Sequence, residues 1–144
     1  MAGSYAWACR TAMITAVDSS VLIAIYLGEP TSDRWLDRLV AARMEGVLLI
    51  SPVVAAEFYA LVEEREAYDS VLADMGLQLS SISLDAACEA GRVFRAYRDA
   101  GGPREFLIPD FLIAAHAQID CDRLAADDRG YLRRYFPNLT LLMI

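Results

Sequence analysis

The sequence contains no lysine, and all 13 of its basic residues are arginine. This absence disfavours three classes of protein that depend on a lysine side chain. A P-loop needs lysine at the nucleotide phosphates, and a Schiff-base enzyme needs it as the nucleophile. A phospho-receiver domain also usually carries one. The chemistry of this chain therefore has to come from other groups.

Positive charge as a whole is scarce, because 20 acidic residues give the chain a formal net charge of −7. A general nucleic-acid coat protein is normally basic, so the net charge argues against that class. It does not exclude an enzyme that meets phosphate through a bound metal ion and a local group of arginines.

Cysteine is also scarce and shows no paired spacing. Cys9, Cys88 and Cys121 are odd in number and lie far apart. This pattern argues against both a disulfide framework and a zinc site. Reduced thiols of this kind indicate a cytoplasmic protein.

Long apolar runs are missing too. The run Val21–Leu27 has seven residues, whereas a membrane span needs roughly 18. Arg10 interrupts the segment that would be apolar in a signal peptide, and Met13 stands directly before the first predicted strand. We therefore expect residues 1–12 to be an extension outside the fold, and residues 13–144 to form one domain with a real core.

Apolar runs bounded by capping and helix-breaking residues predict alternating strands and helices. Strands are expected at 13–17, 47–50, 77–82, within 120–126 and at 139–143. Helices are expected at 19–27, 31–44, 52–65, 67–75, 83–99 and 110–118, with a short turn at 131–135. Such alternation predicts a single α/β domain whose largely parallel sheet is covered on both faces.

Carboxylates stand beside apolar residues at the ends of these elements. Asp18 ends the first strand, Asp110 begins a helix, and Asp127 and Asp128 close the fourth strand. An acid next to packing surface is costly unless its charge is compensated. Taken singly, however, each of these acids could be a helix cap or part of a turn.

Glu57 is harder to explain in that way. Spacings of three and four residues place it on one stripe of its helix with Val53, Ala56, Ala60 and Leu61. We therefore expect Glu57 to point with the apolar side, where neither a cap nor a solvated surface accounts for it.

The acids are expected to meet at one place. The carboxyl ends of parallel strands share one edge of a sheet, and right-handed crossovers could bring all of these acids to that edge. Carboxylates so close together would repel and raise some of their pKa values. A hard divalent cation resolves that conflict, and oxygen ligands favour Mg²⁺ or Mn²⁺.

Four segments, taken in order, resemble the PIN domain and more narrowly the VapC-type toxin ribonucleases of bacterial toxin–antitoxin pairs. They are Val17–Leu22, Glu57, Pro109–Ala115 and Leu124–Tyr131. The resemblance extends from about residue 13 to the end and depends on order and spacing, since no segment is specific alone. It implies a three-layer α/β/α domain with a mostly parallel sheet of about five strands.

The resemblance also implies a metal-dependent endoribonuclease that uses Mg²⁺, with Mn²⁺ as a substitute. The positions that match the family's acids are Asp18, Glu57, Asp110 and Asp128, with Asp127 as the spare candidate for the fourth. Ser20 matches a small polar residue that commonly hydrogen-bonds within the site. Ala126 stands where the family usually has Thr or Ser, so a hydroxyl is missing there.

The implied chemistry is metal-ion catalysis. One or two ions would lower the pKa of a bound water and align it with a phosphodiester, and would neutralise charge on the phosphate. The expected product carries a 5′-phosphate, and no covalent protein intermediate is needed.

His116 and two arginines also lie in or near the segments expected to form the site. His116, the only histidine, lies about 120° around its helix from Asp110. We therefore expect it to pack or to lie at the surface rather than to act as a base. Arg129 and Arg133 are nearer the expected site and are candidates for contacting the RNA backbone.

The implied partners are an RNA substrate, a small cognate antitoxin and a second copy of the chain in a homodimer. Two alternatives keep the same scaffold: a PIN nuclease of RNA maturation, and a catalytically silent binding module. A phosphohydrolase of the haloacid dehalogenase type is disfavoured. It needs an Asp two residues after its nucleophile, and Ser20 occupies that place.

Overall fold

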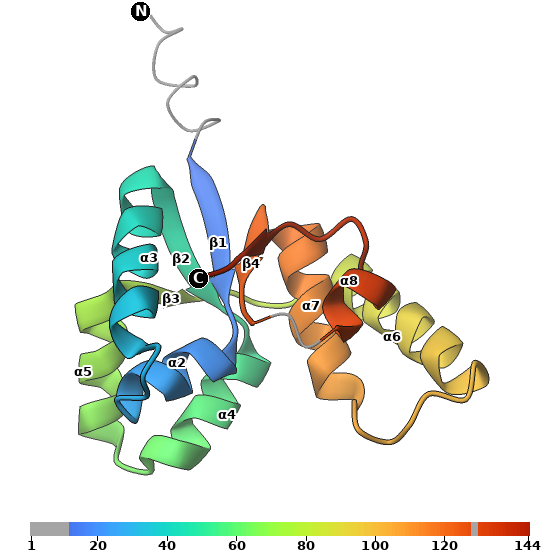
Figure 1. Cartoon of the computed structure of the whole chain (residues 1–144), viewed down its shortest axis with the longest axis horizontal. Helices are drawn as coiled ribbons and strands as arrows, with labels where there is room; N and C mark the ends of the chain where they lie inside the picture. The colour runs from blue at the N-terminus through green and yellow to red at the C-terminus, as the bar shows by residue number, and fades with distance from the viewer. Residues whose placement is uncertain (1–11, 128–129) are drawn as a thin grey trace, which may run out of the picture.

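Five strands form one parallel sheet at the centre of the molecule (Figure 1). The structure, a computed structural model, describes residues 12–127 and 130–144. The sheet order is β3-β2-β1-β4-β5, and all four strand pairings are parallel. The strands are β1 (Met13–Val17), β2 (Gly46–Ile50), β3 (Leu77–Leu79), β4 (Arg123–Ala125) and β5 (Leu141–Leu142).

Helices cover both faces of this sheet. In Figure 1 the first four described helices lie on one side of it and the last three on the other. They are α2 (Ser19–Tyr26), α3 (Ser32–Glu45), α4 (Pro52–Val62), α5 (Arg65–Met75), α6 (Leu84–Asp99), α7 (Ile108–Asp120) and α8 (Tyr131–Tyr135). The architecture is therefore three layers, α/β/α, as the sequence predicts.

The core fills the two spaces between the sheet and its helices. Its largest fully buried side chains include Trp35 and Phe58 from the first helical layer and Tyr97, Phe111 and Phe136 from the second. Burying a side chain of this size stabilises the fold by roughly 1.5–3 kcal/mol. No described helix is long and apolar enough to cross a membrane.

The central pair of strands begins with a close approach that only glycine permits. Gly46 pairs with Met13 at the start of β1 and β2. A Cβ atom on Gly46 would lie 1.9 Å from the carbonyl oxygen of Met13. Any larger residue at position 46 would therefore displace the start of β1 from β2.

The predicted order of elements is confirmed, and most of the differences lie at their ends. The helix that begins at Pro52 stops at Val62, because Glu63 adopts a left-handed backbone conformation with φ of 64°. The strands β3 and β5 are shorter than predicted. Both lie at an edge of the sheet, where a strand pairs with one neighbour only. Residues 131–135 form a short helix instead of a turn.

Candidate functional site

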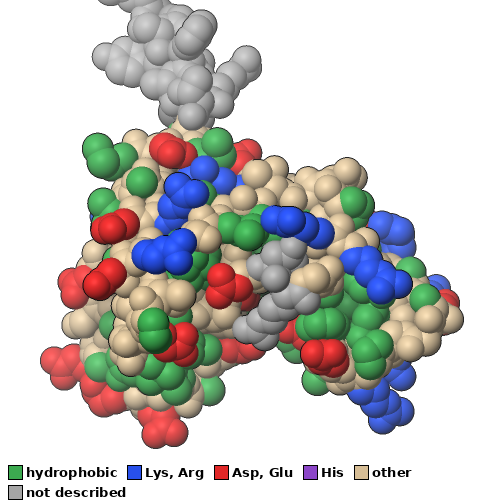
Figure 2. All heavy atoms as spheres, in the orientation of Figure 1, with side chains coloured by type: hydrophobic (Ala, Val, Ile, Leu, Met, Phe, Trp, Pro, Cys, Tyr) green, Lys and Arg blue, Asp and Glu red, His purple; other side chains and the backbone are tan. Residues whose placement is uncertain are grey.

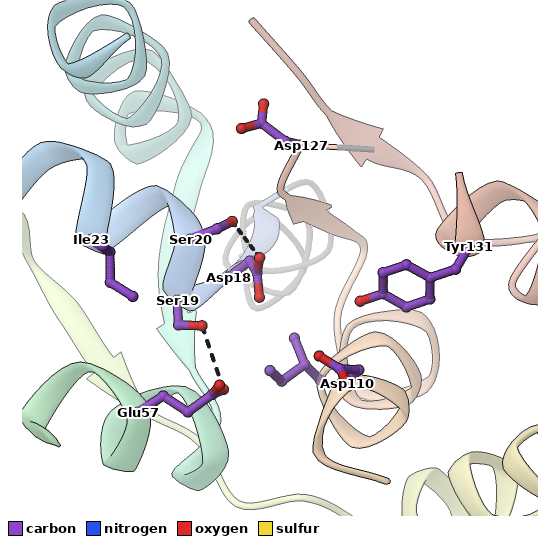
Figure 3. Close-up of a pocket in the computed structure, with 9 residues that line it drawn as sticks. Asp18, Ser19, Ser20, Ile23, Glu57, Asp110, Asp127 and Tyr131 are labelled. Atoms are coloured by element: carbon purple, nitrogen blue, oxygen red, sulfur yellow. Dashed lines mark hydrogen bonds between the residues drawn. The ribbon is translucent and has the colours of Figure 1, made fainter. Parts of the chain in front are cut away.

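A pocket of about 180 Å³ opens at the carboxyl ends of β1 and β4. This volume is several times the ~30 Å³ that one water molecule occupies in the liquid. Side chains from α2, α4, α7, α8 and the segment after β4 contribute to its wall (Figure 3). The lining residues are Asp18, Ser19, Ser20, Ile23, Glu57, Asp110, Ile113, Asp127 and Tyr131.

Asp18 occupies the N-cap position of α2 but does not cap it. Its side chain makes no capping hydrogen bond to the helix. Instead, its Oδ2 atom accepts a hydrogen bond of 2.5 Å from the Ser20 hydroxyl. The backbone N–H of Asp18 donates to the carbonyl of Ala125 at 3.0 Å, which joins the end of β1 to β4. A helix cap therefore does not explain this carboxylate, which lines the pocket.

Asp110 combines the two roles that the sequence leaves open. Its Oδ2 atom accepts a hydrogen bond of 2.8 Å from the backbone N–H of Leu107, just before α7. The side chain is half-buried and also lines the pocket. A carboxylate has two oxygens with several acceptor sites, so it can bind the helix end and still face the pocket.

The prediction that Glu57 lies on the buried face of its helix is wrong. The buried residues of α4 are Val54, Phe58 and Val62, whereas Glu57 is exposed. The helix is apolar almost all round, so the size of the side chains decides which face packs inward. The face that carries Phe58 has the larger side chains. Glu57 nevertheless reaches the pocket, where Ser19 Oγ lies 3.4 Å from Glu57 Oε1.

The fourth acid is the least defined part of the site. Asp127 is exposed and lines the pocket, but its carboxylate points away from the other three acids in Figure 3. Asp128 and Arg129 lie outside the described residues. Ala126 is fully buried, so this corner offers no hydroxyl at that position.

The chemistry of this donor set fits a hydrated hard cation. Carboxylate and hydroxyl oxygens from separate elements surround the pocket, and none of its described lining residues is basic. Within the described ranges, no three His, Cys, Asp or Glu side chains stand close enough to enclose an ion. Mg²⁺ does not require such a cage, since it is usually held by one or two carboxylates and keeps several waters.

His116 and Arg133 do not line the pocket. His116 is buried, with Nε2 3.2 Å from the Ser80 hydroxyl, so it packs as expected. Burial lowers the pKa of His116, and the negative charge of Asp120 opposes that shift. Arg133 is exposed on α8, where its guanidinium lies 3.3 Å from the sulfur of Met143.

Two polar lining residues, Ser19 and Tyr131, have no predicted role in the sequence. Ser19 follows Asp18 directly and contacts Glu57 across the pocket. Tyr131 lies at the end of the last segment that resembles the PIN family. Its place within that segment was the available signal, but its contact with the pocket depends on packing between distant parts of the chain.

The family of the protein follows from its sequence as a whole. The model of the PIN domain family matches residues 15–137, and the chain belongs to this family. No curated protein sequence matches the chain at a significant level.

Solved structures of similar fold include toxin–antitoxin proteins. VapBC2 from Rickettsia felis, solved with a DNA fragment from their promoter, has a TM-score of 0.72 and 22% identity over 92% of this chain and 99% of that one. VapBC-1 from nontypeable Haemophilus influenzae has a TM-score of 0.68 and 15% identity over 91% of this chain and 98% of that one. VapC20 from Mycobacterium tuberculosis, a sarcin–ricin loop cleaving toxin, has a TM-score of 0.59 and 18% identity. The match covers 81% of this chain and 92% of that one.

Proposed function

We propose that this protein is a Mg²⁺- or Mn²⁺-dependent endoribonuclease that acts as the toxin of a toxin–antitoxin pair. The observation that carries the proposal is one pocket of a PIN domain that is lined by acids from four separate parts of the chain. Asp18, Glu57, Asp110 and Asp127 all line it. An RNA substrate and an antitoxin partner would both place such a toxin in the cytoplasm.

The roles of the acids follow from how each is held. Ser20 and Leu107 hold Asp18 and Asp110 in place, so these two carboxylates form the fixed part of the metal site. Glu57 is exposed and would reach the ion through water. Asp128 is the proposed fourth acid, with Asp127 as the alternative. The ion, when bound, supplies an activated water and neutralises phosphate charge.

Similarity in fold supports the choice of RNA as substrate. VapC20 is a toxin that cleaves the sarcin–ricin loop. Arg133 is exposed on α8, the helix that begins with the pocket residue Tyr131, and is proposed with Arg129 to contact the RNA backbone. Replacing a phosphate-contacting arginine weakens binding and lowers its salt dependence by about one unit of slope.

Similarity in fold also supports an antitoxin partner, since related structures are toxin–antitoxin complexes. Exposed apolar side chains are available for association. They include Tyr26 (43% exposed), Leu27 (56%) and Leu107 (54%). Figure 2 shows apolar side chains gathered over α2 and, across a hollow, over the region of α8. We propose that such surfaces bind the antitoxin and a second copy of the chain in a homodimer.

Two experiments separate this proposal from its alternatives. RNA cleavage that requires Mn²⁺ and stops in excess EDTA is expected of the nuclease, whereas a silent PIN module neither cleaves RNA nor binds Mn²⁺ in a calorimetric titration. Growth arrest on induction, relieved by co-expression of a small neighbouring gene, is expected of a toxin. A nuclease of RNA maturation would cleave RNA without arresting growth.

A further inference from the structure

We propose that Tyr131 is a substrate-contacting residue of this site, whose hydroxyl donates a hydrogen bond to a non-bridging oxygen of the scissile phosphate. The inference rests on the proposed ribonuclease function. It also gives a chemical role to a lining residue that is not an acid.

Tyr131 lies close to where a phosphate bound at the acids would be. The residue opens α8 and lines the pocket together with Asp18 and Asp110. Its phenol oxygen is directed into the space between these acids (Figure 3). It enters from the wall opposite Ser19 and Ser20, so a phosphate held at the acids would lie between the serines and the phenol.

The described wall of the pocket offers few hydrogen-bond donors to a bound phosphate. A phosphodiester brings oxygen acceptors, whereas the described wall of the pocket consists largely of carboxylate acceptors and apolar groups. The hydroxyls of Ser19 and Ser20 donate to Glu57 and Asp18. A phenol O–H rotates to suit its acceptor, and hydrogen bonds to charged groups are stronger than those between neutral groups. A phosphate bound at the acids would lie within reach of the phenol oxygen of Tyr131, which faces the pocket from the wall opposite the serines.

The ring of Tyr131 is held in place by other aromatic rings. It stacks on Phe106 with centroids 4.2 Å apart and an angle of 27° between the planes. It also lies 6.2 Å from the ring of Phe111, which is fully buried. A tyrosine has only two side-chain torsions, and this packing restrains both. A group fixed before the substrate arrives loses little entropy on binding it.

Phe106 depends in turn on a tightly constrained loop between α6 and α7. The hydroxyl of Tyr97 donates a hydrogen bond to the carbonyl of Pro103 in this loop. A Cβ atom on Gly102 would lie 2.5 Å from the Tyr97 ring, so glycine is needed there. We therefore assign Phe106 as a positioning residue that acts through Tyr131.

The test compares Tyr131→Phe with Tyr135→Phe. Both variants lose one hydroxyl from α8. Tyr135 belongs to the same aromatic cluster, with its ring 5.1 Å from that of Tyr97, but it does not line the pocket. We expect Tyr131→Phe to lower kcat/KM for RNA cleavage roughly 10- to 100-fold, the effect of losing a hydrogen bond to a charged group. We expect Tyr135→Phe to keep a kcat/KM within about twofold of the wild type, because Tyr135 does not line the pocket. Circular dichroism checks that both variants are folded.

A second comparison tests the positioning role. Phe106→Leu keeps the hydroxyl of Tyr131 but removes the stack, so it is expected to lower kcat/KM, and the double variant with Tyr131→Phe should lose little more. Wild-type kcat/KM in Tyr131→Phe, or equal losses in both tyrosine variants, would overturn the inference while the wild-type enzyme remains active. Absence of metal-dependent cleavage by the wild type would instead overturn the proposed function.

Discussion

The Ser20 hydroxyl donates a hydrogen bond of 2.5 Å to Asp18 across the junction of β1 and α2. This contact turns the Asp18 carboxylate into the pocket, although its position in the chain is that of a helix cap. A hydrogen bond from a neighbouring side chain holds a metal-ligating carboxylate in a fixed orientation. Much of the preorganisation of the site therefore depends on one small polar side chain.

Replacement of Ser20 by alanine should weaken metal binding without unfolding the protein. Groups that orient metal ligands typically contribute 10- to 100-fold in metal affinity, and we expect a loss of roughly tenfold for Mn²⁺. Calorimetric titration measures this, and thermal melting by circular dichroism checks the fold. Ser70→Ala, at an exposed position on α5, is the matched control. Unchanged Mn²⁺ affinity in Ser20→Ala would contradict the assigned role.

Asp110 should show two separable effects. In Asp110→Asn the amide oxygen can still accept from the Leu107 N–H, so stability is kept while RNA cleavage is lost. In Asp110→Ala the cap is lost as well, which costs about 1 kcal/mol of unfolding free energy. Urea unfolding of both variants measures the difference. Equal destabilisation of the two would show that the cap contact contributes little.

Trp35 offers a test of the packed core. It is fully buried on α3, and its indole N–H has no hydrogen-bond partner in the described part of the chain. Trp35→Ala should lower the free energy of unfolding by roughly 3–5 kcal/mol. Trp35→Phe should cost much less, because it also removes a buried donor that has no partner. Urea unfolding distinguishes the two, and similar losses would contradict the described environment of the indole.

Stability should fall in mild acid through His116. Burial lowers its pKa in the folded state below the ordinary value of 6.5. The unfolded chain therefore binds the proton first, and the stability contributed by neutral His116 is present above pH 6.5 and is lost as the pH falls toward the folded pKa. The variant His116→Gln can keep a hydrogen bond to Ser80 and does not titrate. Its unfolding free energy should depend less on pH between about 7 and 5 than that of the wild type. Parallel pH profiles for the two proteins would contradict this assignment.

The parts of the site that sequence could predict are those fixed by local rules. Asp18 and Asp110 stand at a strand end and a helix start, and parallel strands bring such positions to one sheet edge. Ser51 and Ser83 stand at the starts of two predicted helices, where serine is a common cap, and both hydroxyls accept a backbone N–H there. These features depend on a few neighbouring residues and on the topology of the fold.

The parts that sequence could not predict depend on distant packing. The inward face of α4 was ambiguous, because apolar residues surround Glu57 on the helix, and the choice fell to Phe58 and its contacts with Tyr26 and Tyr68. The place of Tyr131 depends on its stack with Phe106, 25 residues earlier in the chain. No local sequence pattern predicts either contact.

The central claim is that the acids of this pocket cleave RNA with the help of a divalent cation. Its most direct test is cleavage of total RNA in Mn²⁺ by the wild type, Asp18→Asn and Asp99→Asn, with the product ends mapped. Asp99 is an exposed acid at the end of α6 and serves as the matched control. We predict 5′-phosphate ends, with activity retained in Asp99→Asn and abolished in Asp18→Asn or in excess EDTA. Undiminished cleavage by Asp18→Asn, or by the wild type in EDTA, would contradict the account.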